Sequence, residues 1–358
     1  MHRVALALAR RRRAGMSPAG DRSGSSAPRT HVFDEAFDPV WDESLVDAAT
    51  AGIGPRWWRM AHLIQGQQSE YDAIVTWGER LSLALLAQQR FSGSHKPHIA
   101  MIGQFEKPNI RLPLTLLKRD LHAVVTWTSV QRRALVEKLR FPSERVYLVR
   151  HFVDQVFYSP RSADEHTICA VGAEMRDYAT LLEAMRGTGI PCHIATDHVR
   201  VPGRFRLFKD RRMPISEIRA GANPSVTCGR LALSELRELY ARSRFVVVPL
   251  VPSNSDNGVT VILEAMAMGK PVICSRTRGQ VDVIQEGVTG LYVPVGDAAA
   301  LRAAIQSLWH EPLRAKEMGR HAREYVERYH TLEGFASATR SAVEASLDGR
   351  PATDTWWS

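Results

Sequence analysis

Two Rossmann-like α/β domains in tandem, finished by helices, are the architecture that this sequence predicts. In residues 30–150 and again in residues 166–330, short β-rich runs alternate with helical ones, which is typical of parallel sheets. Runs such as "TICAVG" and "RFVVVPL" are apolar throughout, as strands are when helices cover both faces of a sheet. We expect the two domains to face each other across a cleft, with ligands at the carboxyl ends of the strands.

The segments outside these two series predict a linker and a helical C-terminus. Residues 151–165 are irregular and polar and contain a proline, which indicates a linker between the domains. Beyond Asp297 the apolar residues recur at helical spacing to near Ser346. We therefore expect residues 331–358 to form a C-terminal helix and tail.

The first 29 residues have a different composition. Residues 1–29 are rich in Arg, Ser, Gly and Pro, which is typical of a disordered basic tail. Only residues 3–8 predict a strand, and we place it at the edge of the sheet. Deletion of the tail is therefore expected to leave folding and ligand binding intact.

Composition indicates a cytoplasmic protein without a nucleic-acid partner. The net charge is +9, but seven arginines and one aspartate fall within residues 1–30, so most of the excess lies in the tail. The apolar runs are far shorter than the roughly 20 residues of a membrane-spanning helix. The cysteines show no CxxC spacing and have mostly apolar neighbours, as buried thiols of a reducing compartment do; they are Cys169, Cys192, Cys228 and Cys274.

Several common catalytic and metal-binding motifs are missing. The sequence contains no GxGxxG, GxxxxGK[ST], HExxH or GxSxG pattern, and no two aspartates stand two residues apart. Dinucleotide-binding, P-loop, zinc-protease and nucleophile-elbow interpretations therefore have no support. We expect neither a metal site nor a cofactor.

The stretch "SDNGVTVILEAMAMGKPVI" carries the candidate ligand site. Glu264 interrupts an apolar helix, where a carboxylate is costly unless hydroxyl groups satisfy it. Asp256 lies in the loop before the helix, and the amides of residues 258–260 are expected to be open at its positive end. The order carboxylate, amides, carboxylate suits a sugar, a diphosphate and a ribose. The alternatives are that the Asp caps the helix and that the Glu pairs with an internal Arg.

Residues from about 151 to 336 resemble the carboxyl-terminal domain of retaining GT-B glycosyltransferases, specifically glycosyltransferase family 4. "SDNGVTVILEAMAMGKPVICS" is similar to the family's E-x7-E segment, usually EGxGxxxLEAMAxGxPVIAS. "VIQEGVTGLYVPVGDAAALRAAIQSLW" and "VTCGRLALSELRELYARSRFVVVP" resemble the regions that follow and precede that segment. The amino-terminal half matches only in its rhythm and in "VYLVRHFVDQVFYSP".

The resemblance implies a role for each candidate residue. Glu264 takes the place of the glutamate that binds the ribose hydroxyls, and Asp256 that of the glutamate that contacts the donor sugar. The remaining assignments are amides of Gly258, Val259 and Thr260 to the diphosphate, Gly229 and Arg230 near the base, and Arg176 to a phosphate. The shorter aspartate is a departure from the family, as is the "GAEMR" loop, which lacks the family's second basic residue. As an alternative, Arg176 pairs with Asp177 or Glu174.

These assignments imply a retaining hexosyltransferase-type glycosyltransferase that needs no metal. The sugar would move from a nucleoside-diphosphate sugar, with UDP favoured over GDP, to a hydroxyl of a glycan, lipid or small molecule. The missing Asp-x-Asp agrees, since the other main glycosyltransferase fold binds its donor through a metal on that motif. The alternatives are a non-catalytic GT-B donor-binding or partner subunit and, with less support, a GT-B epimerase.

The acceptor half yields fewer predictions. Where the family often has a histidine, this sequence offers Gln104, while His62 and His98 remain open. "PRWWRMAHLI" and "RLPLTLLKR" mix apolar residues with Arg and Lys, which suits peripheral contact with the inner face of an anionic membrane. The alternative is that both are core-facing helices with solvated cations.

Overall fold

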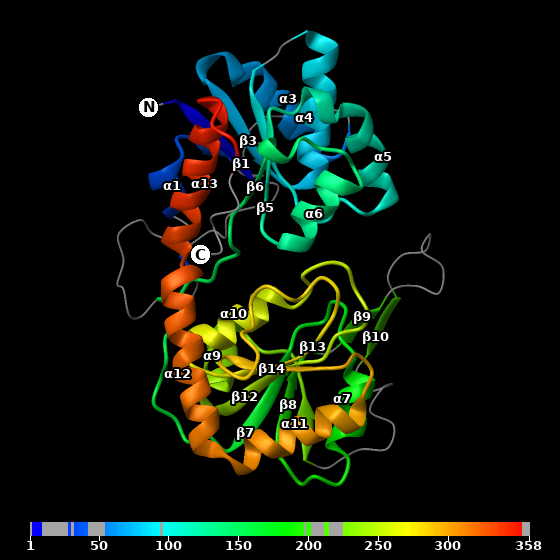
Figure 1. Cartoon of the computed structure of the whole chain (residues 1–358), viewed down its shortest axis with the longest axis vertical. Coiled ribbons are helices and arrows are strands. Elements are labelled where there is room, and N and C mark those ends of the chain that lie inside the picture. Colours follow the sequence, from blue (N-terminus) through cyan, green and yellow to red (C-terminus); the bar gives the residue numbers. More distant parts are fainter. Residues whose placement is uncertain are drawn as a thin grey trace. The chain divides into compact units, whose positions relative to one another are not determined.

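The computed structural model describes residues 2–8, 28–29, 32–41, 54–93, 96–196, 198–201, 211–214 and 225–352. The chain divides into two compact units. The first unit comprises residues 1–19, 29–151 and 333–358, and the second comprises residues 20–28 and 152–332. Each contains a six-stranded sheet with flanking helices (Figure 1), so the predicted two-domain α/β architecture is confirmed.

The sheet of the first unit is parallel throughout. Its strands lie in the order β2-β1-β3-β4-β5-β6. They are β1 (Val4–Leu8), β2 (Val40–Trp41), β3 (Ala73–Trp77), β4 (His98–Met101), β5 (Ala123–Thr126) and β6 (Val146–Leu148). The helices of this unit are α1 (Val32–Ala36), α3 (Arg56–Gln67), α4 (Glu79–Ser92), α5 (Pro108–Leu117), α6 (Ser129–Glu137) and α13 (Leu332–Leu347), with short 3-10 turns at Gln68–Glu70, Lys118–Asp120 and Ser143–Arg145.

The C-terminal helix α13 returns to the first unit. Phe335 packs edge-on against Phe33 of α1, with ring centroids 6.1 Å apart. The carbonyl of Ser346 accepts a hydrogen bond from the ring of His122 at 2.9 Å. The last helix therefore completes the core of the unit that begins the chain.

Strand β1 lies inside the sheet, and the prediction of an edge strand was wrong. It pairs with β2 on one side and β3 on the other, and Val4, Ala5, Leu6 and Ala7 are at most 1% exposed. The sequence shows only that "VALAL" is apolar; the two-residue strand β2, which covers its outer side, carries too little pattern to be predicted. The expectation that residues 1–29 are a tail without a packed element is therefore wrong for β1, and a deletion that includes this strand should impair folding. Residues 9–27 of the expected tail lie outside the described residues.

The second unit also has a parallel sheet, in the order β11-β8-β7-β12-β13-β14. Its strands are β7 (Thr167–Val171), β8 (Cys192–Ala195), β11 (Val226–Cys228), β12 (Ser243–Val248), β13 (Val272–Ser275) and β14 (Gly290–Val293); β9 (His198–Val201) and β10 (Arg211–Pro214) form a separate antiparallel pair. Its helices are α7 (Tyr178–Met185), α9 (Leu233–Arg242), α10 (Val259–Ala267), α11 (Ala298–His310) and α12 (Pro312–Tyr329).

Helices cover both faces of this second sheet (Figure 1). Alternate strand residues point to opposite sides: Val246 and Val248 pack in the cluster of α9, α10 and α12, while Phe245 and Val247 pack in that of α7 and α11. This arrangement explains the apolar strands. It also explains the apolar α10, which lies between β12 and α12. The backbone of α12 lies directly against the end of α10: a Cβ on Gly319 would lie only 2.0 Å from the carbonyl oxygen of Gly269.

We expect that shortening a buried side chain of β1 destabilises the protein. Leu6→Ala removes a side chain that is 1% exposed, and such a cavity costs about 2–5 kcal/mol of unfolding free energy. Leu116→Ala is the control, because that leucine is 69% exposed. Thermal and urea unfolding measure the difference, and equal stability of the two variants would contradict the interior placement of β1.

Candidate functional site

The candidate site lies where the chain order of the second sheet reverses. Numbered along the chain, its strands stand 3-2-1-4-5-6, so β7 and β12 are neighbours whose connections leave in opposite directions. Ligands of doubly wound sheets bind outside the carboxyl ends of the strands at this point. The loops after the two strands are joined there by a β-bridge between Arg176 and Leu250 and by a 3.0 Å bond from the amide of Asp177 to the carbonyl of Pro249.

Arg176 places a buried positive charge in this position. Arg176 is 5% exposed, and its guanidinium donates to the carbonyls of Val171 and Glu174, each at 2.9 Å. Two glycines make room for it: a Cβ on Gly172 would lie 2.8 Å from Nη2, and one on Gly258 would lie 3.6 Å from Nη1.

No carboxylate forms an ion pair with Arg176 among the described residues, so the predicted alternative partners are not observed. Asp177 instead caps α7 by accepting bonds from the amide and hydroxyl of Thr180 at 3.1 and 2.7 Å. Glu174 contacts the guanidinium only through its backbone carbonyl. A buried cation with neutral partners is costly, and an anionic ligand would offset that cost.

The N-terminus of α10 lies beside this guanidinium. Gly258 is the N-cap residue with φ +90°, and no side chain caps the helix. The amide of Val259 donates to the carbonyl of Asp256 at 3.1 Å, so the prediction that it is open was wrong. Within the described part of the chain, no acceptor takes the amides of Gly258 or Thr260. These two amides and the helix dipole add to the positive potential of Arg176.

Asp256 lies in the loop before α10 but does not cap it. Its carbonyl, rather than its carboxylate, accepts the amide of Val259 and, at 3.3 Å, the side-chain amide of Gln280. The loop is also held by close backbone contact, because a Cβ on Gly279 would lie 2.3 Å from the carbonyl oxygen of Ser255. The predicted N-cap alternative for Asp256 is therefore not observed.

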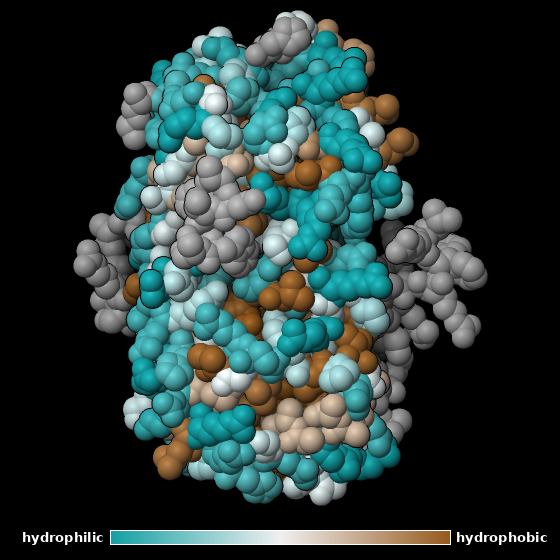
Figure 2. Space-filling view, viewed as in Figure 1, coloured by the Kyte–Doolittle hydropathy of each residue, from teal (hydrophilic) through white to brown (hydrophobic). Residues whose placement is uncertain are grey.

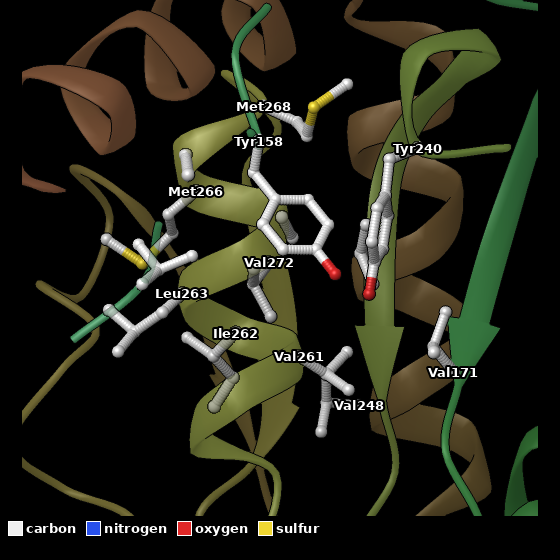
Figure 3. Close-up of a cluster of buried hydrophobic side chains, with 14 of the residues drawn as sticks. Tyr158, Val171, Tyr240, Val248, Val261, Ile262, Leu263, Met266, Met268 and Val272 are labelled. Atoms are coloured by element: carbon white, nitrogen blue, oxygen red, sulfur yellow. The ribbon is translucent and has the colours of Figure 1, made fainter. Parts of the chain in front are cut away.

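Glu264 is half-buried and is held by two tyrosines rather than by an arginine. The hydroxyl of Tyr240 donates to Oε2 at 2.8 Å, and the hydroxyl of Tyr158 also donates to this carboxylate. Figure 3 shows both hydroxyl groups pointing to the same side beside α10. Burial raises the pKa of Glu264 from 4.5 to about 7, against the two tyrosine bonds and the charge of Arg176, which lower it. The carboxyl group thus titrates near neutral pH.

Gly229 and Arg230 lie on the same edge of the sheet but apart from this cluster. They follow β11, three strands from β12 in the sheet, which corresponds to about 14 Å. The amide of Gly229 donates to the carbonyl of Ile194 at 3.1 Å, and Arg230 is exposed. The structure therefore brings Arg176, Gly258 and Thr260 together, and places this pair farther along the edge.

The polar candidates of the first unit have ordinary structural positions. His98 is buried and bonds to the hydroxyl of Thr76 at 2.7 Å, and burial lowers its pKa to about 3. His62 is exposed on α3. Gln104 is exposed after β4, with its amide donating to the carboxylate of Glu79 at 2.7 Å.

Sequence analysis missed the residues that shape the site. Tyr158, Tyr240 and Gln280 contact a candidate residue from a distant part of the chain, and Gly172 makes room for Arg176 from four residues before it. The only signal for the tyrosines was the cost of a carboxylate in an apolar helix, which requires donors without identifying them. The described residues contain no group of three His, Cys, Asp or Glu placed to bind a metal. Within them, too, no helix is long and apolar enough to cross a membrane.

Comparison with known proteins assigns the segment that holds α10. Residues 209–311 match the family described as "Glycosyl transferases group 1". The chain is 36% identical over 109 residues to the sulfoquinovosyl transferase SQD2 of Arabidopsis thaliana, which is 30% of this chain and 21% of that protein. It is 36% identical over 103 residues to a D-inositol 3-phosphate glycosyltransferase of Acidothermus cellulolyticus, 28% of this chain and 23% of the relative. The match thus spans about a fifth of each relative's length.

Solved structures match over nearly the whole chain. A glycosyltransferase from Rickettsia africae superposes with a TM-score of 0.69 at 15% identity, covering 97% of this chain and 99% of that one. Sucrose-phosphate synthase from Thermosynechococcus elongatus gives 0.67 at 17%, covering 97% and 100%. Anabaena HepE in complex with UDP and glucose gives 0.71 at 13%, covering 97% and 100%.

The fold is therefore the GT-B fold of glycosyltransferases, as predicted. Within this fold, residues 209–311 are the part of the chain that matches the glycosyl transferases group 1 family.

The close approach of Gly258 to its neighbours gives a test of the site's geometry. We expect Gly258→Ala to destabilise the protein, because its Cβ would lie 2.8 Å from Val248 Cγ1. Gly187→Ala is the control: Gly187 also has positive φ, +73°, but nothing lies within 4 Å of its Cβ position. The control should show only the left-handed backbone cost of about 1–2 kcal/mol. Equal unfolding free energies would show that the space at Gly258 is not limiting.

Proposed function

We propose that this protein transfers a sugar from a nucleoside-diphosphate sugar to an acceptor hydroxyl with retention of configuration, and that it needs no metal ion. The observation that carries the proposal is the buried guanidinium of Arg176, which lies beside the N-terminus of α10 and whose partners among the described residues are two carbonyls and the hydroxyl of Tyr178, all neutral. A diphosphate supplies the missing negative charge. It also fits the position, at the reversal of strand order.

Each residue then has a role in donor binding or in departure of the leaving group. Arg176 and the amides of Gly258 and Thr260 neutralise the diphosphate as the glycosidic bond breaks. Glu264 accepts hydrogen bonds from the ribose hydroxyls, and Asp256 faces the sugar, where positive charge develops. Gly229 and Arg230, at the end of β11, lie on the side of the nucleobase.

Transfer requires one bond to break and one to form at the anomeric carbon. The carbon–oxygen bond to the diphosphate breaks, and the acceptor oxygen bonds to the same carbon on the face that the diphosphate leaves. Because the acceptor enters on that face, configuration is retained. The departing phosphate oxygen takes the acceptor's proton, so no protein base is needed. The positive charge of Arg176 and of the amides serves the purpose that a metal serves in other glycosyltransferases.

The comparisons support a uridine nucleotide as the donor. HepE, which shares the fold, was solved with UDP and glucose and with UDP-glucose. We propose UDP rather than GDP for this chain, with no further cofactor. The name of one relative, a D-inositol 3-phosphate glycosyltransferase, suggests a small polar hydroxyl compound as the acceptor. The alternative is a protein that binds the donor without transferring the sugar, and the experiment below distinguishes the two.

The two carboxylates should give different kinetic defects. Glu264→Gln should weaken UDP binding and raise the donor KM, because ribose contact is equal in the ground and transition states. Asp256→Asn should lower kcat while UDP affinity stays near that of the wild type. Calorimetry with UDP separates the two, after a thermal-shift screen of UDP-, GDP- and ADP-sugars.

Asp164→Asn is the matched control, since that carboxylate is 93% exposed. EDTA should leave binding and transfer unchanged. If Glu264→Gln binds UDP as the wild type does, or if no nucleotide sugar stabilises the protein, the proposal is wrong. Donor binding without transfer to any acceptor would instead favour a non-catalytic subunit.

We also propose that α5 contacts an anionic membrane surface. Ile110 and Leu114 face the core, whereas Leu112 and Leu116, about 200° away around the helix, are 66% and 69% exposed. Phe91, at the end of α4, is 88% exposed, and the Arg90–Asp120 ion pair at 2.7 Å holds that end beside the end of α5. Figure 2 shows apolar side chains protruding at the upper right, where Figure 1 labels α5.

Cations flank this apolar surface, which we define as Phe91, Leu112 and Leu116. Lys107, Arg111 and Arg119 are exposed on or next to α5. Apolar side chains ringed by cations suit the headgroup region of anionic lipid. The other predicted stretch offers a smaller apolar surface, because Met60, Ala61 and Ile64 of α3 are buried and Trp58 is 37% exposed.

Vesicle co-sedimentation tests the membrane proposal. The wild type should bind vesicles of phosphatidylcholine with phosphatidylglycerol, more weakly at high salt, and Leu112→Ser with Leu116→Ser should release most of it without lowering the melting temperature. The control is Leu313→Ser, at an 83% exposed leucine of α12. The proposal would be contradicted if the double variant bound vesicles as the wild type does. It would also be contradicted if the wild type were a dimer that the double substitution dissociates.

A further inference from the structure

Tyr158 and Tyr240 enclose Glu264 from two elements that are distant in sequence. Tyr240 belongs to α9, and Tyr158 lies in the segment between β6 and β7. Both are almost fully buried, and their rings meet edge-on with centroids 6.2 Å apart (Figure 3). A phenylalanine would fill either position with the same apolar volume. The hydroxyl groups therefore need an explanation other than packing, and both donate to Glu264.

Arg323 fixes the backbone that carries Tyr158. Its Nη1 donates to the carbonyls of Gln155, Tyr158 and Ala267 at 2.9, 3.0 and 2.7 Å. Ala267 is the last residue of α10, so one guanidinium ties the Tyr158 segment to the helix that bears Glu264. The amide of Tyr158 also donates to the carbonyl of Asp154 at 2.9 Å. The hydroxyl of Tyr158 is thus held at a fixed place relative to α10.

The hydrogen-bonding capacity of the carboxylate leaves room for a ligand. An ionised carboxylate has about four acceptor sites. The two tyrosines use two of them, and two remain, which is what a vicinal pair of hydroxyl groups requires.

The groups around Glu264 act on its charge in opposite directions. Burial favours the protonated form, while the two tyrosine hydroxyls and the charge of Arg176 favour the ionised form. Next to Tyr240, burial raises the pKa of the Cys169 thiol to about 12, so it carries no charge. Each hydrogen bond from a tyrosine hydroxyl therefore helps to keep Glu264 ionised at neutral pH.

We propose that Tyr158 and Tyr240 are positioning residues, which hold Glu264 ionised and in one orientation so that it can accept the two ribose hydroxyls of the donor. This inference rests on the proposed function. It adds two residues that touch neither the sugar nor the diphosphate but act through the carboxylate.

The pH dependence of UDP affinity tests the inference. For the wild type, affinity should rise with pH as Glu264 ionises. In Tyr158→Phe and Tyr240→Phe the lost hydrogen bond raises the pKa of Glu264, so the rise should move to higher pH. A shift of one pH unit lowers the ionised fraction at pH 7 about fivefold, and UDP affinity with it. At pH 8.5 the variants should approach the wild type.

Two reference proteins complete the experiment. Glu264→Gln gives the baseline that contains only the titration of the nucleotide's own phosphate. Tyr147→Phe is the control, because that hydroxyl bonds to the carbonyl of Arg350 in the first unit, and its profile should match the wild type.

The outcomes separate this inference from the proposed function. A tyrosine variant that loses the same affinity at every pH would show that its hydroxyl only supports the fold, and an unshifted profile in both variants would overturn the inference. If Glu264→Gln itself binds UDP like the wild type, it is the proposed function that fails. The two tyrosines are tested separately, so a folding defect in one leaves the other to decide.

Discussion

Coverage of a parallel sheet on both faces is the constraint on which the second unit depends. With α9, α10 and α12 on one face and α7 and α11 on the other, the inner strands β7 and β13 are buried along their whole length and offer a ligand no surface. Binding groups are therefore restricted to the loops at the ends of the strands. At the reversal between β7 and β12, two such loops lie side by side and need not cross. The dense packing of the sheet thus determines where chemistry can take place.

Dense packing also makes it energetically costly to keep the two ionisable groups of this region charged. Arg176 and Glu264 are both removed from much of the water, and neither has an ion-pair partner among the described residues. In the absence of ligand, the raised pKa of Glu264 means that the folded state holds a proton that the unfolded state has lost. Between about pH 4.5 and 7 this group therefore lowers stability as pH rises. A ligand that brings phosphate to one group and hydroxyls to the other relieves both costs.

The loop before α10 shows how the backbone prepares such a site. Positive φ at Gly258 turns the chain so that the helix begins beside Arg176, and no capping side chain occupies the space above its first amides. The side-chain amide of Gln280 donates to two carbonyls of this loop, and the backbone at Gly279 packs closely against it, so both hold the loop in place. The departures from the family pattern in this loop are thus accommodated in an ordered structure.

The sequence by itself determined the two α/β domains, the position of α10 and the two carboxylates beside it, because strand and helix periodicity and the local motif are properties of contiguous residues. It also indicated Arg176 through the resemblance to family 4. Only the tertiary structure decided that β1 is an interior strand, that the amide of Val259 is used in a turn, and that Glu264 is bound by Tyr158 and Tyr240. Each of these depends on contacts between residues far apart in the chain, for which no local pattern exists: β1 receives its outer neighbour from residues 40–41, and Glu264 receives its donors from 24 and 106 positions away.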